Sequence, residues 1–215
     1  VGLLAAASPA SAADTITADV ECCTFAPGPY FQDLGEIPLF ENPPGANPHN
    51  VTSTATGPDG GELFRSKTIA AGDTTPVAGT QYLEAGTYPF YCTLHGASMS
   101  GELIVEDGKG AVVPRPSVKV SIPSQRLKKV RRSGRVKVKV RAVTASSGIA
   151  VTVKRGSKAI ASASKISLQA GASRVLKLKL TRKGRKAIRK GRKVGLTARA
   201  TVAFGKASKA KRSLR

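Results

Sequence analysis

Residues 86–101 read GTYPFYCTLHGASMSG, with Cys92, His95 and Met99 in the second half of the stretch. This pattern predicts a β-strand, a tight loop and a second strand. The loop brings together a thiol, an imidazole and a thioether. These are soft and borderline metal ligands, the set that suits copper.

The predicted first strand orients the thiol. Tyr88, Phe90 and Cys92 have the same parity, so they face the same side of a regular strand and Cys92 points inward beneath the loop. A second imidazole, His49, lies far upstream and must come from another strand end. The chain has two histidines and one methionine, so no competing site can be built from these residue types.

Charge divides the 215-residue chain in two. All 13 acidic residues lie between Asp14 and Asp107, a part that contains only two basic residues, Arg65 and Lys67. The remaining 33 Lys and Arg follow from residue 108 onward, with no acid among them. This asymmetry indicates two units with different roles toward the solvent.

The N-terminal residues 1–12 are small and apolar, and Ala10-Ser11-Ala12 resembles a secretory cleavage site. We therefore expect a signal-peptide remnant and an exported protein that is secreted, periplasmic or associated with the cell surface. Three cysteines do not make a disulfide framework. For the neighbours Cys22 and Cys23 the favoured interpretation is one buried and one semi-exposed thiol, and links to another chain or to a metal stay open.

Residues 13–107 contain short β-like runs separated by turn residues, without helical periodicity. Such spacing is typical of a sandwich or a barrel. The expected strands cover residues 15–24, 36–40, 51–54, 63–69, 80–83, 88–93 and 101–106. Nine of the ten aromatic residues lie in this part and would supply most of the core volume.

Residues 108–116 read as a semi-extended linker, and residues 117–215 as a second β-unit. Residues 135–141 alternate strictly, which places Val136, Val138 and Val140 toward a core and the cations toward water. Further strands are expected at 148–153, 159–168, 176–180 and 196–204, with one short helix within 181–190. An antiparallel immunoglobulin-like β-sandwich is the expected result.

The first unit resembles the small blue copper proteins, the plastocyanin, amicyanin and pseudoazurin group of the cupredoxins. The resemblance rests on Phe25-Ala26-Pro27, on residues 48–51 around His49, on the approach to Cys92, and on the closing strand at 101–105. It covers about 95 residues, less than half of the chain. It implies an all-β chain, with a cupredoxin Greek-key sandwich followed by the second sandwich.

The resemblance also implies the roles of the site residues. His49, Cys92 and His95 would hold one copper ion as a trigonal set, and Met99 would be the weak axial ligand. Asn50 would tie the two ligand loops together by hydrogen bonds. His95 would be the exposed ligand through which electrons pass to a redox partner. Gly96 departs from the family, which often has proline after the second histidine.

Three alternatives stay open. Zinc could bind a cysteine and two histidines, although methionine is a poor zinc ligand and favours copper. A copper oxidase or reductase needs further histidines, which this chain lacks, so we expect an electron carrier and no enzyme. The third alternative is a structural protein that binds an anionic polymer of the cell wall or matrix through the basic unit, with the first unit as a scaffold.

Overall fold

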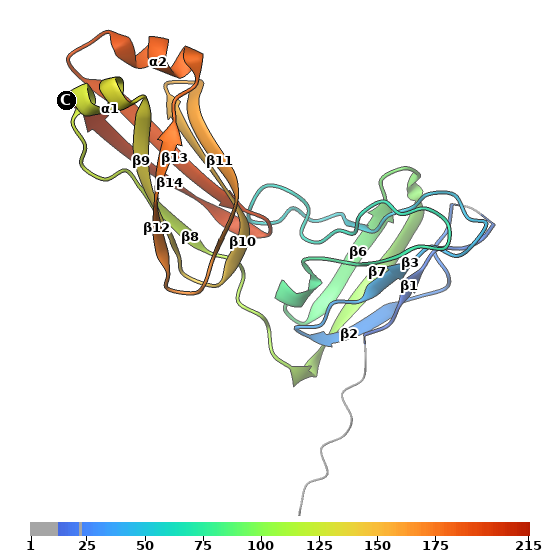
Figure 1. Cartoon of the computed structure of the whole chain (residues 1–215). Coiled ribbons are helices and arrows are strands. Elements are labelled where there is room, and N and C mark those ends of the chain that lie inside the picture. Colours follow the sequence, from blue (N-terminus) through green and yellow to red (C-terminus); the bar gives the residue numbers. More distant parts are fainter. Residues whose placement is uncertain (1–12, 22) are drawn as a thin grey trace, which may run out of the picture. The chain divides into compact units, whose positions relative to one another are not determined.

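The computed structural model describes residues 13–21 and 23–215, and it divides the chain into two compact units, residues 1–114 and 115–215. Each unit is built mainly from β-strands (Figure 1), which confirms the predicted all-β class. The expected signal-peptide remnant at residues 1–12 lies outside the described residues, as does Cys22. Among the described residues no helix is long and apolar enough to cross a membrane.

The first unit contains two sheets. One has the strand order β1-β3-β5 and the other the order β2-β7-β6-β4. The pairs β1–β3 and β2–β7 are parallel, and the other neighbours are antiparallel. The strands are β1 Ile16–Thr17, β2 Tyr30–Leu34, β3 Leu39–Glu41, β4 Thr52–Ser53, β5 Thr74–Pro76, β6 Gly86–Cys92 and β7 Gly96–Gly110.

Aromatic side chains fill the space between these two sheets. Phe90 on β6 and Phe40 on β3 are both fully buried. Phe25 lies between them, with ring centroids 5.0 Å from Phe90 and 6.2 Å from Phe40, both edge to face. Edge-to-face packing adds about 0.5–1.5 kcal/mol per pair beyond the area that each ring buries. The aromatic core therefore fixes β6, the strand that ends at Cys92.

The second unit is also formed by two sheets, with the orders β11-β10-β13-β14 and β12-β9-β8. Its strands are β8 Val118–Ser121, β9 Arg135–Ala142, β10 Ser146–Arg155, β11 Lys158–Leu168, β12 Ser173–Lys179, β13 Val194–Val202 and β14 Gly205–Leu214. Its helices are α1 Leu127–Ser133 and α2 Arg182–Arg189. One apolar cluster with members from both sheets forms the core.

Alternation of valine and cations shapes β9 as the sequence predicts. Val136, Val138 and Val140 are fully buried, while the Lys and Arg between them point away from the core. The predicted helix is observed as α2, and the Thr181 hydroxyl caps it by accepting a 2.9 Å hydrogen bond from the Gly184 amide. The predicted immunoglobulin-like topology stays a prediction.

Two strand predictions in the first unit are wrong, and of the strand expected at residues 15–24 only Ile16–Thr17 is observed as β1. Residues 80–83, expected as a strand, contain the 3₁₀ turn Thr80–Tyr82, because the Thr80 hydroxyl bonds the backbone of Val77 at 3.0 Å and competes with a strand ladder. Residues 63–69 form isolated bridges with several partners and no continuous strand.

The interpretation of Cys23 as a free thiol is also wrong. Cys23 is disulfide-bonded, and its backbone has the left-handed φ of 72°. Among the described residues, Cys92 is the free cysteine, and it is buried. Within the part of the chain that the structure describes, the thiol available for metal chemistry is therefore Cys92, which the sequence singles out.

Candidate metal centre

Three potential metal ligands converge at one end of the first unit. The ligand atoms of His49, Cys92 and His95 all lie within 4.8 Å of one another. Cys92 Sγ is 3.8 Å from His49 Nδ1, and the two imidazole centroids are 4.8 Å apart with the rings inclined by 52°. His49 and Cys92 are fully buried, whereas His95 is half-buried.

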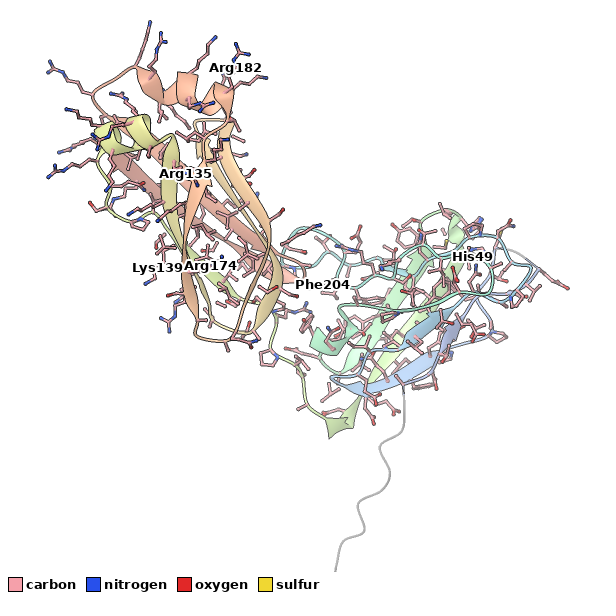
Figure 2. The ribbon with its side chains drawn as sticks, in the orientation of Figure 1. His49, Arg135, Lys139, Arg174, Arg182 and Phe204 are labelled. Atoms are coloured by element: carbon pink, nitrogen blue, oxygen red, sulfur yellow. The ribbon has the colours of Figure 1, made fainter. Side chains whose placement is uncertain are left out.

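His49 is held from a separate part of the chain, as predicted. Its backbone forms a two-way bridge with Ile69, with N to O distances of 3.2 and 3.0 Å. Figure 2 labels its position at the end of the unit. Burial, and secondarily the nearby His95, lowers the pKa of His49 below the ordinary histidine value. A neutral imidazole is the form that binds metals, so the fold favours the ligating form.

The loop after β6 places the other two groups. The His95 amide donates to the Cys92 carbonyl at 3.2 Å, and the Ser98 hydroxyl donates to the His95 carbonyl at 2.7 Å. Gly96 has a φ of 62°, in the left-handed region that favours glycine and that proline cannot adopt. The turn therefore favours glycine at this position and excludes proline.

Asn50 joins the two ligand-bearing segments through its side-chain amide. Its Nδ2 donates to the Thr93 hydroxyl at 2.8 Å and to the Thr68 hydroxyl at 2.9 Å. Its Oδ1 accepts from the Thr93 amide at 3.0 Å and from the Thr52 hydroxyl at 3.1 Å. The Asn50 side chain thus links the segment that carries His49 to the segment that carries Cys92.

Met99, the residue expected as the axial ligand, lies near the start of β7. Its side chain is fully buried and belongs to the same apolar cluster as Cys92 and Phe90. A flexible thioether fits such a position as a core residue as well as a ligand.

Two imidazole nitrogens of the histidines are buried without a hydrogen-bond partner among the described residues. His95 Nδ1 and His49 Nε2 are inaccessible to solvent and have no hydrogen-bond partner among the described residues. A buried polar atom without a partner costs about 1–3 kcal/mol. A metal ion bound to His95 Nδ1 would remove that cost at the nitrogen, and the thiol and imidazole donors fit copper.

Three threonines that bond to Asn50 are not predicted by the sequence. Thr52, Thr68 and Thr93 are separated in the sequence and follow no period that a sequence pattern could detect. Thr93 offers the single local signal, because a hydroxyl residue directly follows the expected ligand Cys92. The hydrogen bonds to Asn50 form between segments that only the folded chain brings together.

Comparison with solved structures finds blue copper proteins. Auracyanin A, a "blue" copper protein from Chloroflexus aurantiacus, is 20% identical, with 43% of this chain and 96% of that chain covered and a TM-score of 0.35. Amicyanin from Paracoccus versutus is 26% identical over 46% of this chain and 85% of its own, with a TM-score of 0.35. Reduced auracyanin from Roseiflexus castenholzii is 21% identical over 46% of this chain and 99% of its own, with a TM-score of 0.36.

The predicted resemblance to blue copper proteins thus appears in three dimensions over less than half of the chain. No protein-family model matches the chain, and no curated protein matches it. Because every one of these TM-scores is below 0.5, the likeness assigns no role to any residue here. The case for a metal rests on the contacts of His49, Cys92 and His95.

Proposed function

We propose that the first unit binds one copper ion through His49, Cys92 and His95, with Met99 as a weak axial ligand, and carries single electrons. The observation that carries this proposal is the convergence of a buried free thiol and two imidazoles within 4.8 Å. Bound copper would supply a one-electron couple between Cu(I) and Cu(II). Thiolate stabilises Cu(I), and neutral imidazoles suit both oxidation states.

The chain's own contribution is to hold these donors in place. The bridge of His49 to Ile69 and the bonds of Asn50 to Thr93 fix two segments that are remote in the sequence. Ligands that cannot rearrange keep one geometry in both oxidation states, so little reorganisation accompanies the movement of one electron. Such a site favours electron transfer over chemistry on a bound substrate.

His95 is the proposed port for the electron. It is half-buried, and its neighbour Leu94 is 56% exposed. Pro44, Gly45 and Ala97, small apolar residues near His49 and His95 in the sequence, are exposed. A small apolar surface around a ligand lets a redox partner approach without desolvating charges.

Further parts of the proposal concern the whole protein. We infer that it is exported, and that it performs no bond chemistry, because no further histidines exist to build an oxidase or reductase centre. Binding of the basic second unit to an anionic envelope polymer would hold the electron carrier at the cell envelope. The structural alternative, a scaffold without redox activity, differs from the carrier in one property, the reversible reduction of bound copper.

The test is the visible spectrum of the full chain after addition of Cu(II). We expect a strong thiolate-to-copper charge-transfer band that ascorbate bleaches and reoxidation restores. Cys92→Ser should abolish the band, and a Cys22→Ser/Cys23→Ser double variant should keep it. A colourless protein that binds zinc more tightly than copper would overturn the proposal, as would a band that survives in Cys92→Ser.

A further inference from the structure

The outward face of the sheet β12-β9-β8 in the second unit is a regular array of cations. On β9, Arg135, Lys137, Lys139 and Arg141 alternate with buried apolar residues, so they share the outer face. Residues two apart on a strand lie about 7 Å apart on the same face. Figure 2 shows Arg135 near α1 and Lys139 farther along the same sheet.

The cations also lie directly opposite one another across strands. Lys137 pairs with Lys177 on β12, and Arg135 pairs with Lys179. Like charges directly opposite each other in a sheet destabilise it. A third pair of this kind joins Arg141 to Lys119 on β8, whereas Lys139 lies opposite Val175 and Ser121. Repulsion between these opposed cations costs the sheet stability, so folding does not explain the charge density of this face.

A groove of about 860 Å³ begins on this face and continues toward α1 and the end of β14. Its lining includes seven cations, no acidic residue and no aromatic residue. The cations are Arg126, Lys129, Arg135, Lys137, Lys177, Arg212 and Arg215. Hydroxyl and amide side chains of Ser124, Gln125, Ser133 and Ser213 lie among them.

The groove has a fixed edge. The Gln125 side chain makes two hydrogen bonds of 2.9 Å to the Lys137 backbone, one to the amide and one to the carbonyl, and so continues the edge of β9 beyond β8. Arg212 is anchored by a 2.9 Å bond from Nη1 to the Ile122 carbonyl. These bonds fix the Lys137 backbone and the Arg212 side chain before any ligand binds, which lowers the entropy cost of binding.

The protein's own acidic groups cannot neutralise this charge. Residues 108–215 contain 33 Lys and Arg and no acid, and the rest of the chain has 13 acidic residues. Even complete pairing between copies of this chain would leave most of the cations unpaired. The partner that complements the groove is therefore an external polyanion of high charge density.

We propose that this groove binds a linear, flexible polyanion with a phosphate backbone. Lys and Arg donate to phosphate oxygens, and arginine does so with a two-pronged fork. The absence of aromatic side chains from the lining disfavours polymers that bind by stacking of bases. A concave groove admits a thin chain, whereas a lipid surface or a rigid duplex contacts only its rim.

The experiment measures the affinity of the full-length protein for long-chain inorganic polyphosphate at several salt concentrations. The groove variant is Lys129→Gln/Lys137→Gln/Lys177→Gln. The loss of three phosphate contacts should lower affinity on the order of 50-fold at 0.15 M salt and reduce the slope of log K against log salt by about 2.

The matched control removes three cations from the other sheet. Lys158, Lys206 and Lys209 are exposed, lie on β11 and β14, and do not line the groove. Their triple change to glutamine alters net charge equally and should leave affinity within about threefold of wild type, since only long-range attraction is lost. Equal losses in the two variants would overturn the proposal, because binding would then follow net charge alone.

Competition identifies the polymer class. Polyphosphate should bind more tightly than heparin, duplex DNA or phosphatidylglycerol vesicles in the same buffer. Tighter binding of any of these three would overturn the phosphate-chain assignment. The copper charge-transfer band provides an internal check, since the groove changes lie in the other unit and should leave the band unchanged.

Discussion

Asn50 and Thr93 are joined by two hydrogen bonds, 2.8 Å from Asn50 Nδ2 to the Thr93 hydroxyl and 3.0 Å from the Thr93 amide to Asn50 Oδ1. The two residues are neighbours in sequence of His49 and Cys92. The distance between two ligands therefore depends on a pair of residues that bind no metal. Residues in such supporting positions orient ligands and tune affinity.

Asn50→Ala should weaken copper binding by about 10–100-fold, because the loops that carry His49 and Cys92 lose their shared amide. A competition titration against a chelator of known affinity measures the change. Thr68→Val is the control, since it removes one bond to Asn50 but none between the two loops. An affinity loss as large in Thr68→Val as in Asn50→Ala would contradict the positioning role.

Met99→Leu should keep the fold and raise the reduction potential of bound copper. Leucine has a similar volume, so the fully buried site should lose less than about 1.5 kcal/mol of stability. The removal of the thioether takes a donor away from Cu(II), which is the form that gains more from it. Voltammetry of the copper-loaded variant checks the direction, and an unchanged potential would show that Met99 is only a core residue.

Gly101→Ala should destabilise the first unit by about 1–3 kcal/mol, as overpacking of a filled core does. A Cβ at Gly101 would lie 2.6 Å from Phe90 Cζ, and Phe90 is fully buried. Denaturant unfolding measures the loss. The double variant Gly101→Ala/Phe90→Leu should be more stable than the sum of the single changes predicts. Simple additivity would show that the clash with Phe90 is not the cause.

The first unit should lose stability in alkaline solution through Tyr30. Burial raises the pKa of Tyr30 above its ordinary value of 10. The folded state therefore retains the proton longer than the unfolded state does. Its stabilising contribution is complete below pH 10 and is lost as the pH rises through the folded pKa. Unfolding temperatures between pH 8 and pH 11 should fall less steeply in Tyr30→Phe.

Lys177→Glu should stabilise the second unit at low salt, because a repulsive pair with Lys137 becomes an attractive one. The expected gain is about 0.2–1 kcal/mol, and it should shrink at high salt. Thermal unfolding at two salt concentrations measures it. Lys158→Glu, at the start of β11, is the comparison for a change in net charge alone. An equal gain in both would remove the case for cross-strand repulsion.

Much of the fold can be predicted from the alternation of apolar and charged residues along the strands. The strict valine and cation repeat of β9 predicts both the strand and its buried face, because one-sided burial leaves a period of two. The same pattern gives a wrong prediction at Thr80. The residues around Thr80 are β-like, but its hydroxyl bonds the local backbone and a 3₁₀ turn results. The short helix α1 has few apolar positions, only Leu127 and Val130 buried, so no helical pattern stands out.

The structure brings together three of the four residues that the sequence predicts as ligands, His49, Cys92 and His95. These residue types are rare in the chain, so few combinations were possible. The threonines around Asn50 and the cation groove beside β9 were not predicted. Both depend on which strands become neighbours, and that is a property of three-dimensional pairing that no local pattern contains.

The separation of His49 from Cys92, 43 residues along the chain, also bears on when the metal can enter. An unfolded chain must close a long loop to bring these two ligands together, and the entropy of closure opposes it. Copper should therefore bind mainly to the folded unit, and it should stabilise that unit in proportion to the logarithm of its free concentration. Metal loading then follows folding, and a rise in melting temperature with copper reports how completely the sandwich has assembled.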